Sequence, residues 1–457
     1  MLISVREMGA VGDGIADDSA AIAKSIAKLK ENGGGTLLFE RGIYLSGTQK
    51  LCSNMELHLE EGAVLKALPE ISAYEKDETA PDAALKYYFL HLDHISNVKI
   101  TGSGKIDGSG PAFWEREFLN PALPPLKDGE EAPDEIPDQL WKYYVLKPKA
   151  ERIVTIYASG CSDLTLKDLA IEDAAAYTVW LIGSERITID NIRVHNRRSG
   201  PNTDILDIDC CRNVRVTNSC LAAGDDCIAL KSDPSRTGTT FVCEDIIVSD
   251  CILSSATCGI RLGYEGDAPI RNCLFENLTI RDSRTAIDFL SVNTPCRYAK
   301  LDHGTPIEGI TFRDITMKNV GRAFFLWAGC SHPEEKYKGY IRNIIFERIT
   351  AEGHITSWIG TEEPDAIRNI SLNDVSLEIE EYLDLEPEAD PLAIPNIWCG
   401  QRRAGALVLR GIAELKSRGF KCRITNSETP ALRWKDTTPF ELNGNLQKPM
   451  GSLQDIQ

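Results

Sequence analysis

No apolar run in the 457-residue sequence reaches the roughly 18 to 20 residues that a membrane helix needs, so we expect no membrane span. Basic residues are outnumbered, because 50 Lys and Arg against 68 Asp and Glu give a net charge of −18. Nucleic-acid binding draws on Lys and Arg patches, so this charge disfavours a nucleic-acid partner. Hydrophobic residues make up 42% and charged residues 26%, ordinary values that exclude a disordered or collagen-like chain.

Cysteine is also sparse. The 14 cysteines among 457 residues are too few for a disulfide scaffold, and they lack the Cys-x-x-Cys or Cys/His spacing of a metal site. Cys220, Cys251 and Cys273 lie in apolar stretches, where a free cysteine behaves as a small buried hydrophobe. The N-terminus has neither a basic leader nor an apolar segment of signal-peptide length. We therefore expect a cytoplasmic protein without a metal or other cofactor. A secreted protein whose leader had been removed would have the same sequence.

One β-type pattern recurs along the chain. Each copy is an alternating apolar run, a separating Asn, Asp or Gly, and a second short apolar run. No helical segment falls regularly between the copies, which disfavours a βαβ barrel or a doubly wound sheet. The copies begin at Val98 and then, at steps of 23 to 37 residues from the second copy onward, at Leu164, Ile187, Val214, Ile246, Cys273, Ile310, Ile344 and Ile370.

A helix-free repeat of this length predicts one coil of a parallel β-solenoid, whose coils stack about 4.8 Å apart around a continuous core. Recurrent Asn residues suit coil corners with left-handed backbone or side-chain ladders. The alternative is a β-sandwich with chance spacing. We predict a single all-β domain over residues 1–457.

Three segments depart from the repeat. Residues 1–70 are predicted to form the N-terminal cap and the first coils, with a short capping helix over 20–29. Residues 119–150 are rich in Pro and acids and predict an inserted polar loop. From about residue 380 the pattern is interrupted, and it resumes in two short runs that we interpret as closing coils over 380–457.

The densest polar cluster lies in the middle of the array. Asp204 and the pair Asp225 and Asp226 are 21 residues apart, about one coil, so we expect them on adjacent coils. Leu206 and Ile208 are predicted to point inward, as are Ile228 and Leu230. On that register Asp226 would enter the core, where an unpaired carboxylate is costly.

The acids are therefore expected just before the strands begin, at a corner that opens to solvent. Three carboxylates at this spacing would perturb one another's pKa values, leaving one protonated and the others charged. That arrangement suits an acid and a base acting across one glycosidic bond. The alternative is that Asp and Asn are turn formers.

The sequence resembles a known family. Residues 6–22, 33–36, 42–47, 57–63 and 102–110, with Trp114, are similar to the opening of pectinase-type right-handed parallel β-helix proteins. Residues 202–204 (Asn-Thr-Asp) and 224–232 (Gly-Asp-Asp-Cys-Ile-Ala-Leu-Lys-Ser) resemble the two acid blocks of glycoside hydrolase family 28, the polygalacturonase family. The similarity runs from about residue 5 to residue 380.

The resemblance implies a right-handed parallel β-helix and a reaction. It makes Asp225 the general acid, while Asp204 and Asp226 hold and activate the water. It implies inversion without a metal, and it makes Asn202 a candidate substrate-binding residue.

Two family motifs are absent. Where the family has Gly-His-Gly, this sequence has Cys258 in place of the histidine thought to support the acid, with Arg261 just beyond. Where the family has the basic pair of Arg-Ile-Lys, which holds the uronate carboxylate, this sequence has Asp288 and Leu290. Losing both cations removes the charge-assisted contacts that a galacturonate needs. Together with the negative net charge, this argues against polygalacturonate as substrate, unless Arg284 or Arg261 substitutes.

Aromatic residues are candidates for stacking on sugar faces. Trp180 lies in a stretch where related enzymes carry an aromatic near the cleft, and each tryptophan is equally a core candidate. Lone histidines in the coil connections are surface or site candidates. The other candidate tryptophans are Trp114, Trp327, Trp358 and Trp398. The candidate histidines are His303, His332 and His354.

The favoured hypothesis is an inverting, exo-acting glycoside hydrolase whose partner is a short plant- or microbial-polysaccharide-derived oligosaccharide, and not polygalacturonate. The alternatives are a galacturonate-oligomer hydrolase, a polysaccharide lyase on the same fold, and a non-catalytic glycan-binding β-helix. The sequence gives neither the sugar and linkage nor the oligomeric state.

Overall fold

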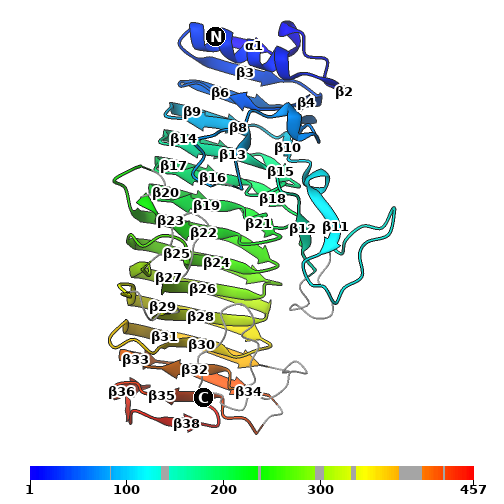
Figure 1. Cartoon of the computed structure of the whole chain (residues 1–457). Helices are drawn as coiled ribbons and strands as arrows, with labels where there is room; N and C mark the ends of the chain where they lie inside the picture. The colour runs from blue at the N-terminus through cyan, green and yellow to red at the C-terminus, as the bar shows by residue number, and fades with distance from the viewer. Residues whose placement is uncertain are drawn as a thin grey trace. The chain divides into compact units, whose positions relative to one another are not determined.

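The computed structural model describes residues 1–82, 84–134, 144–234, 238–293, 303–330, 336–379, 404–425 and 428–456. The chain divides into two compact units, unit 1 (residues 1–229 and 234–242) and unit 2 (230–233 and 243–457). Within each unit parallel strands stack coil upon coil, as labelled in Figure 1, which confirms the predicted parallel β-helix. In the described part of the chain, no helix has the length and apolarity to cross a membrane. The single domain over 1–457 stays a prediction.

In the part of unit 1 that the structure describes there is one α-helix, α1 (Ser19–Glu31), and there are the 3-10 turns η1 (Arg6–Met8), η2 (Ile71–Ala73) and η3 (Gly110–Phe113). Its strands are β1 (Leu2–Ser4), β2 (Asp13–Asp17), β3 (Gly35–Phe39), β4 (Gly42–Ser46), β5 (Gln49–Lys50), β6 (Met55–Leu59), β7 (Ala63–Ala67), β8 (Tyr87–Asp93), β9 (Ser96–Thr101), β10 (Lys105–Asp107), β11 (Trp114–Phe118), β12 (Leu146–Pro148), β13 (Ile153–Ser159), β14 (Ser162–Lys167), β15 (Ala170–Glu172), β16 (Val179–Ile182), β17 (Glu185–Asp190), β18 (Arg193–His195), β19 (Leu206–Asp209), β20 (Arg212–Thr217) and β21 (Cys220–Ala223); β22 (Ile228–Lys231) follows.

Each complete coil of unit 1 supplies one strand to a B sheet and two to an A sheet. The B sheet of unit 1 is β5, β8, β13, β16 and β19, and the A sheet includes β14, β17 and β20. The strands pair in parallel and in register, so that Leu164, Ile187 and Val214 stack on one another. All three are buried while their sequence neighbours are more exposed, which is the alternation that the repeat predicts.

Unit 2 contains long strands with the same alternation of buried and more exposed residues, together with shorter or fully buried strands, and its last two strand pairings are antiparallel. Its strands are β23 (Cys243–Ser255), β24 (Cys258–Gly263), β25 (Ile270–Arg281), β26 (Thr285–Asn293), β27 (Pro306–Val320), β28 (Arg322–Cys330), β29 (Tyr340–Gly353), β30 (Ser357–Thr361), β31 (Ile367–Ile379), β32 (Leu407–Arg410), β33 (Ala413–Arg418), β34 (Lys421–Ile424), β35 (Leu432–Lys435), β36 (Phe440–Leu442), β37 (Asn445–Gln447) and β38 (Gly451–Leu453). Of these, β32 and β34 are the closing strands expected after residue 380, while residues 380–403 lie outside the described residues.

Corner residues adopt the left-handed backbone expected of the recurrent Asn positions. Asn97, Asn191 and Asn369, for example, have φ of 56°, 53° and 55°. Their side chains form ladders between coils: Asn191 Nδ2 donates to Asp168 Oδ1 at 2.7 Å, and Asn369 Nδ2 donates to Asn343 Oδ1 at 2.7 Å. Asn and Asp tolerate this conformation better than other residues with a side chain, so they mark the corners in the sequence.

The N-terminal helix and the inserted loop lie where the sequence predicts them. The helix α1 begins after Asp18, whose carboxylate accepts hydrogen bonds from the backbone N–H groups of Val11 and Gly12 at 2.6 and 3.1 Å. In the insertion, β11 and β12 pair antiparallel at its base. Residues 135–143 of the insertion lie outside the described residues.

The cysteine expectations are met in part. Cys251 and Cys273 are buried, and burial raises the pKa of the Cys273 thiol to about 12. Cys220 is exposed, which corrects the expectation that it packs as a hydrophobe. It occupies the first position of β21, where the alternation turns the side chain outward.

A ring stack in unit 2 offers a test of the core. Phe312 is fully buried, and its ring stacks on Phe275 and Phe346 with centroids 4.7 and 5.4 Å apart. Phe312→Ala should lower the free energy of unfolding by roughly 3 to 5 kcal/mol, because a buried Phe leaves a cavity. The midpoint of guanidinium unfolding measures this, with Ile252→Ala as control, since Ile252 is 42% exposed on β23. Equal midpoints for the two variants would contradict this packing.

Candidate active site

The acids of the first block and of the second block occupy one corner on successive coils. Asp204 lies two residues before β19 and Asp226 two residues before β22. The Thr178 N–H donates to the Asp204 carbonyl at 2.8 Å, and the Ile205 N–H donates to the Asp226 carbonyl at 2.9 Å. These bonds align Tyr177, Asp204 and Asp226 on three successive coils. The expected placement of the acids on adjacent coils, ahead of the strands, is therefore what the structure has.

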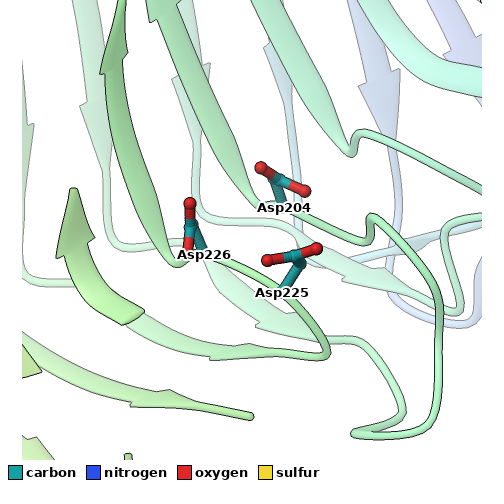
Figure 2. Close-up of side chains that lie close together, drawn as sticks. All are labelled: Asp204, Asp225 and Asp226. Atoms are coloured by element: carbon teal, nitrogen blue, oxygen red, sulfur yellow. The ribbon is translucent and has the colours of Figure 1, made fainter. Parts of the chain in front are cut away.

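The three carboxylates converge. Oxygen atoms of Asp204, Asp225 and Asp226 lie within 4.8 Å of one another, and Figure 2 shows the three groups around a common space. Asp204 and Asp226 are only 5% and 3% exposed, whereas Asp225 is half-buried. The expectation of an open corner is thus wrong for two of the three acids, because neighbouring residues cover the side chains of Asp204 and Asp226.

A buried arginine supports the first acid block. Arg152 is 3% exposed, and its guanidinium donates to the Pro201 carbonyl at 2.6 Å and to Asn202 Oδ1 at 3.0 Å. Asn202 has a left-handed φ of 53°, so the arginine holds a left-handed turn two residues before Asp204. Sequence reasoning missed Arg152. Its one signal is a charge immediately before an apolar run, where burial of a cation requires partners.

Asn196 and Gly224 complete the corner. Buried Asn196 accepts from the Ala174 N–H at 3.0 Å and donates from Nδ2 to Thr178 Oγ1 at 2.7 Å and to the Thr203 carbonyl at 3.1 Å. At Gly224 a Cβ would lie 2.4 Å from Thr203 Oγ1, so the close approach of the two coils requires glycine. The residues before Asp204 and Asp225 are therefore held by hydrogen bonds and close packing.

The sequence-predicted residues of unit 2 form a second polar cluster. Arg261 and Asp288 are register partners on β24 and β26. The Arg261 Nη2 lies 3.4 Å from Asp288 Oδ2 and donates to Cys258 Sγ at 2.9 Å. The Cys258 thiol in turn donates to Asp288 Oδ2 at 3.2 Å. Cys258 and Asp288 are buried and Arg261 is half-buried, so the three side chains form a compact contact triangle.

A second guanidinium, also missed in the sequence, lies nearby. Arg322 is buried, lies over the Phe325 ring at 4.2 Å and donates from Nε to Thr285 Oγ1 at 3.0 Å. Burial lowers the pKa of Arg322 to about 10, and the charge of Asp288 opposes that shift. Arg284 is half-buried just before β26. Leu290, which lies on β26, is buried in an apolar cluster that includes Phe325 and Trp358.

The tryptophans among the described residues pack inside the protein. Trp180 is 0% exposed, and its ring makes edge-to-face contacts with Tyr157 and Tyr177, at centroid distances of 5.3 and 5.5 Å. No face of Trp180 is presented to a sugar, which corrects its expected stacking role. The described tryptophans Trp114, Trp327 and Trp358 are buried too, His303 and His354 are half-buried, and Trp398 and His332 lie outside the described residues.

The three carboxylates of the acid cluster are chemically suited to bind a cation as well as to transfer protons. Carboxylate oxygens are ligands of Ca²⁺ and Mg²⁺. Within the described ranges, Asp204, Asp225 and Asp226 are the one group of acids, cysteines and histidines close enough to share an ion.

The inserted loop is fastened beside this corner by ion pairs. Asp134 accepts from the Arg198 N–H at 2.9 Å and lies 3.0 Å from His195 Nε2, and Arg197 contacts both Glu131 and Asp173 at 3.3 and 3.2 Å. The contacts of Asp134 and Glu131 join residues 131–134 to residues 195–198, which lie shortly before the first acid block. We call them the loop clasp.

The ion pair of the loop clasp shifts the pKa values of His195 and Asp134 in opposite directions. Asp134 raises the pKa of His195 above its usual value, aided by the charges of Asp173 and Glu172 and opposed by burial, while the pKa of Asp134 is lowered by His195. The histidine therefore stabilises the clasp below its unfolded-state pKa and loses that contribution as the pH rises through its folded pKa. The aspartate contributes above its ordinary pKa and loses its contribution as the pH falls through its folded value.

An NMR titration of the His195 ring checks this. Asp134→Asn should move the pKa of His195 downward toward its ordinary value. Glu131→Gln is the matched control, because the ion pair of Glu131 in the loop clasp is made with Arg197. An unchanged titration in Asp134→Asn would show that the ion pair is absent in solution.

Comparison with known proteins adds family relationships. The probable polygalacturonase of Vitis vinifera is 25% identical over 353 residues, 73% of this chain and 64% of that protein, so the chain spans less than two thirds of its relative's length. Among solved structures, an exopolygalacturonase from Thermotoga maritima has a TM-score of 0.64 at 19% identity, covering 99% of this chain and 95% of that one. A family 28 exopolygalacturonase from Yersinia enterocolitica has a TM-score of 0.70 at 15% identity, covering 98% and 79%. These two likenesses show the fold.

The profile described as "Glycosyl hydrolases family 28" matches residues 142–379, which include both acid blocks and more than half of the 457 residues. The chain belongs to glycoside hydrolase family 28.

Proposed function

We propose that this protein is an inverting glycoside hydrolase that cleaves short oligosaccharides from chain ends. The observation that carries the proposal is the convergence of Asp204, Asp225 and Asp226 at one corner of adjacent coils. Membership of family 28 supports the reaction class, because the three acids lie in its two matching blocks.

The exposures of the acids fit different roles. Half-buried Asp225 is the most accessible of the three and, as the general acid, gives its proton to the leaving glycosidic oxygen. The buried pair Asp204 and Asp226 holds the attacking water and takes its proton as the new bond to the anomeric carbon forms and the old bond breaks. The products are a hemiacetal and an alcohol. The enzyme has given one proton to the leaving oxygen and has taken one proton from the water.

Inversion in this proposal rests on the family resemblance. As a general rule, carboxyl groups of inverting enzymes are about 6.5 to 9.5 Å apart and those of retaining enzymes about 5 to 5.5 Å apart. Oxygens within 4.8 Å lie below the first range, so spacing alone would not indicate inversion. The anomeric configuration of the first product, read by NMR, distinguishes the two outcomes.

Asp225→Asn should lower kcat by about 10²-fold or more, because loss of a general acid removes roughly that factor. The carboxamide has nearly the same shape, so the far-UV spectrum and unfolding midpoint should be unchanged. Asp233→Asn, a buried acid outside the acid triad, is the control for loss of an acid in this part of the chain. Near-wild-type turnover in both Asp225→Asn and Asp204→Asn would refute the assignment.

The same assay separates the other hypotheses. Activity that survives EDTA and yields no unsaturated product excludes a calcium-dependent lyase. Loss of activity in EDTA would instead indicate that the three carboxylates bind a metal ion. Sugar binding without any release of reducing ends would indicate a non-catalytic module.

For the substrate we propose a neutral sugar at the subsite that corresponds to the family's basic pair. Asp288 replaces one of those cations, and its carboxylate already contacts the guanidinium of Arg261. An ionised Asp288 repels a bound carboxylate, whereas its oxygens can accept hydrogen bonds from sugar hydroxyls. Leu290, at the other position, is buried and has no polar group to offer.

A galacturonate-oligomer hydrolase is the second candidate, because the relatives above are named polygalacturonases and because Arg322 brings another guanidinium to this cluster. Arg284 and Arg261 are the further cations of the cluster. In this reading one of the three arginines takes the place of the missing basic pair.

Comparison of kcat/KM for neutral α-linked oligosaccharides and for galacturonate oligomers decides between them. Neutral substrates should be preferred by roughly a hundredfold or more, since two charge-assisted contacts of about 1.5 to 3 kcal/mol each are missing. Asp288→Asn should narrow that difference by removing the repulsion. If galacturonate oligomers are the better substrates and Arg322→Met or Arg284→Ala abolishes the preference, the second candidate is correct.

A further inference from the structure

The outward face of the B sheet in unit 1 is filled with aromatic rings. Trp180 and Ile182 alternate along β16 with Val179 and Leu181, so the two pairs point to opposite faces. Trp180 and Ile182 belong to a buried cluster that includes Tyr88 on β8. Tyr88 and Tyr157 stack with ring centroids 3.9 Å apart, and Tyr157 contacts Trp180. This face is therefore closed by packing in the coils that precede the acids.

A chain excursion covers the rings. Between η2 and β8 the chain leaves the coil and returns, with Lys76 bridging antiparallel to Tyr87 and the Asp77 N–H donating to the Lys86 carbonyl at 2.8 Å. Leu85 from this excursion is a buried member of the same cluster, and Ala80 packs against it. These side chains come from outside the β coil, so the cluster lies on the outward face of the sheet and not in the coil interior.

Tyr177 extends this packing to the coil next to Asp204. It occupies the same corner as Asp204, one coil earlier, because the Thr178 N–H donates to the Asp204 carbonyl. Its ring is buried and meets Trp180 edge to face, at an interplanar angle of 85°. We call Tyr177, Trp180, Tyr157, Tyr88 and Leu85 the aromatic wall. The wall begins one coil step, about 4.8 Å, from Asp204.

We infer that the aromatic wall ends the sugar-binding site on the Tyr177 side of Asp204 and leaves room there for a single terminal sugar. The inference rests on the proposed function and names its product. Asp204 and Asp226 follow each other along the stack, so the sugars on the two sides of the cleaved bond are displaced in that direction. One coil step accommodates one sugar ring, and the next step is occupied by Tyr177 and Trp180. The enzyme therefore releases a monosaccharide from one chain end.

The product series of the wild-type enzyme tests the inference. Linear oligosaccharides of increasing length, from tetramer to hexamer, of neutral α-linked sugars and of galacturonate, are labelled at the reducing end and digested briefly. A monosaccharide should be the first product at every length, released either from the labelled or from the unlabelled end. First products of two or more sugars at both ends would overturn the wall while leaving the hydrolase proposal intact. Absence of hydrolysis throughout would count against the hydrolase proposal.

Variants locate the wall. Tyr177→Ala should shift the first product of the longer oligosaccharides from monosaccharide to disaccharide, because it opens the position next to Asp204. Tyr177→Phe keeps the ring and is the matched control, with the monosaccharide pattern retained. Identical product patterns in Tyr177→Ala and Tyr177→Phe would refute the role of Tyr177.

A measurement without turnover keeps the inference testable if a variant folds poorly. Crystals of Asp225→Asn soaked with a trisaccharide should show no more than one sugar on the Tyr177 side of residue 225. Two or more ordered sugars on that side would overturn the wall, whatever the hydrolysis assays give.

Discussion

The backbone hydrogen bond between one coil corner and the next is the interaction on which the site depends. It converts a separation of about twenty residues in the sequence into direct adjacency, because each N–H at a corner finds its acceptor one coil later. Asp204 and Asp226 are neighbours for this reason, although neither side chain has to attract the other. The repulsion between their carboxylates is offset by coil packing, a larger and cooperative source of stability. The scaffold thereby holds together charges that would separate in a flexible loop.

The fold and the acid cluster could be predicted because both are periodic properties. The alternation of Leu164, Ile187 and Val214 reveals the inward face, and the left-handed Asn and Asp corners mark the coil ends. Once the period is known, the spacing between the two acid blocks gives their adjacency. Their burial could not be read in the same way, since exposure at a corner depends on the connections that pass over it.

What the sequence did not reveal comes from single, non-periodic contacts. Trp180 has the position of a cleft aromatic, but an excursion with no repeat signature covers it. Arg152 and Arg322 act on residues about 50 and 37 positions away, Asn202 and Thr285, and an isolated arginine has no pattern that identifies such a partner. Cys258 shows the converse case. Its departure from the family motif is visible in the sequence, whereas its contacts with Arg261 and Asp288 require the structure.

The order of the bonds at the acid corner has a consequence for synthesis. The N–H groups of Ile205 and Leu206 have as acceptors the carbonyls of Asp226 and Cys227, which leave the ribosome about twenty residues later. As the chain is made from its N-terminus, Asp204 therefore stands on the growing edge of the solenoid, with an open row of donors, until the following coil docks. Each corner is completed only after the following coil has been synthesised. A translational pause inside that interval would prolong an exposed edge that the finished protein never presents.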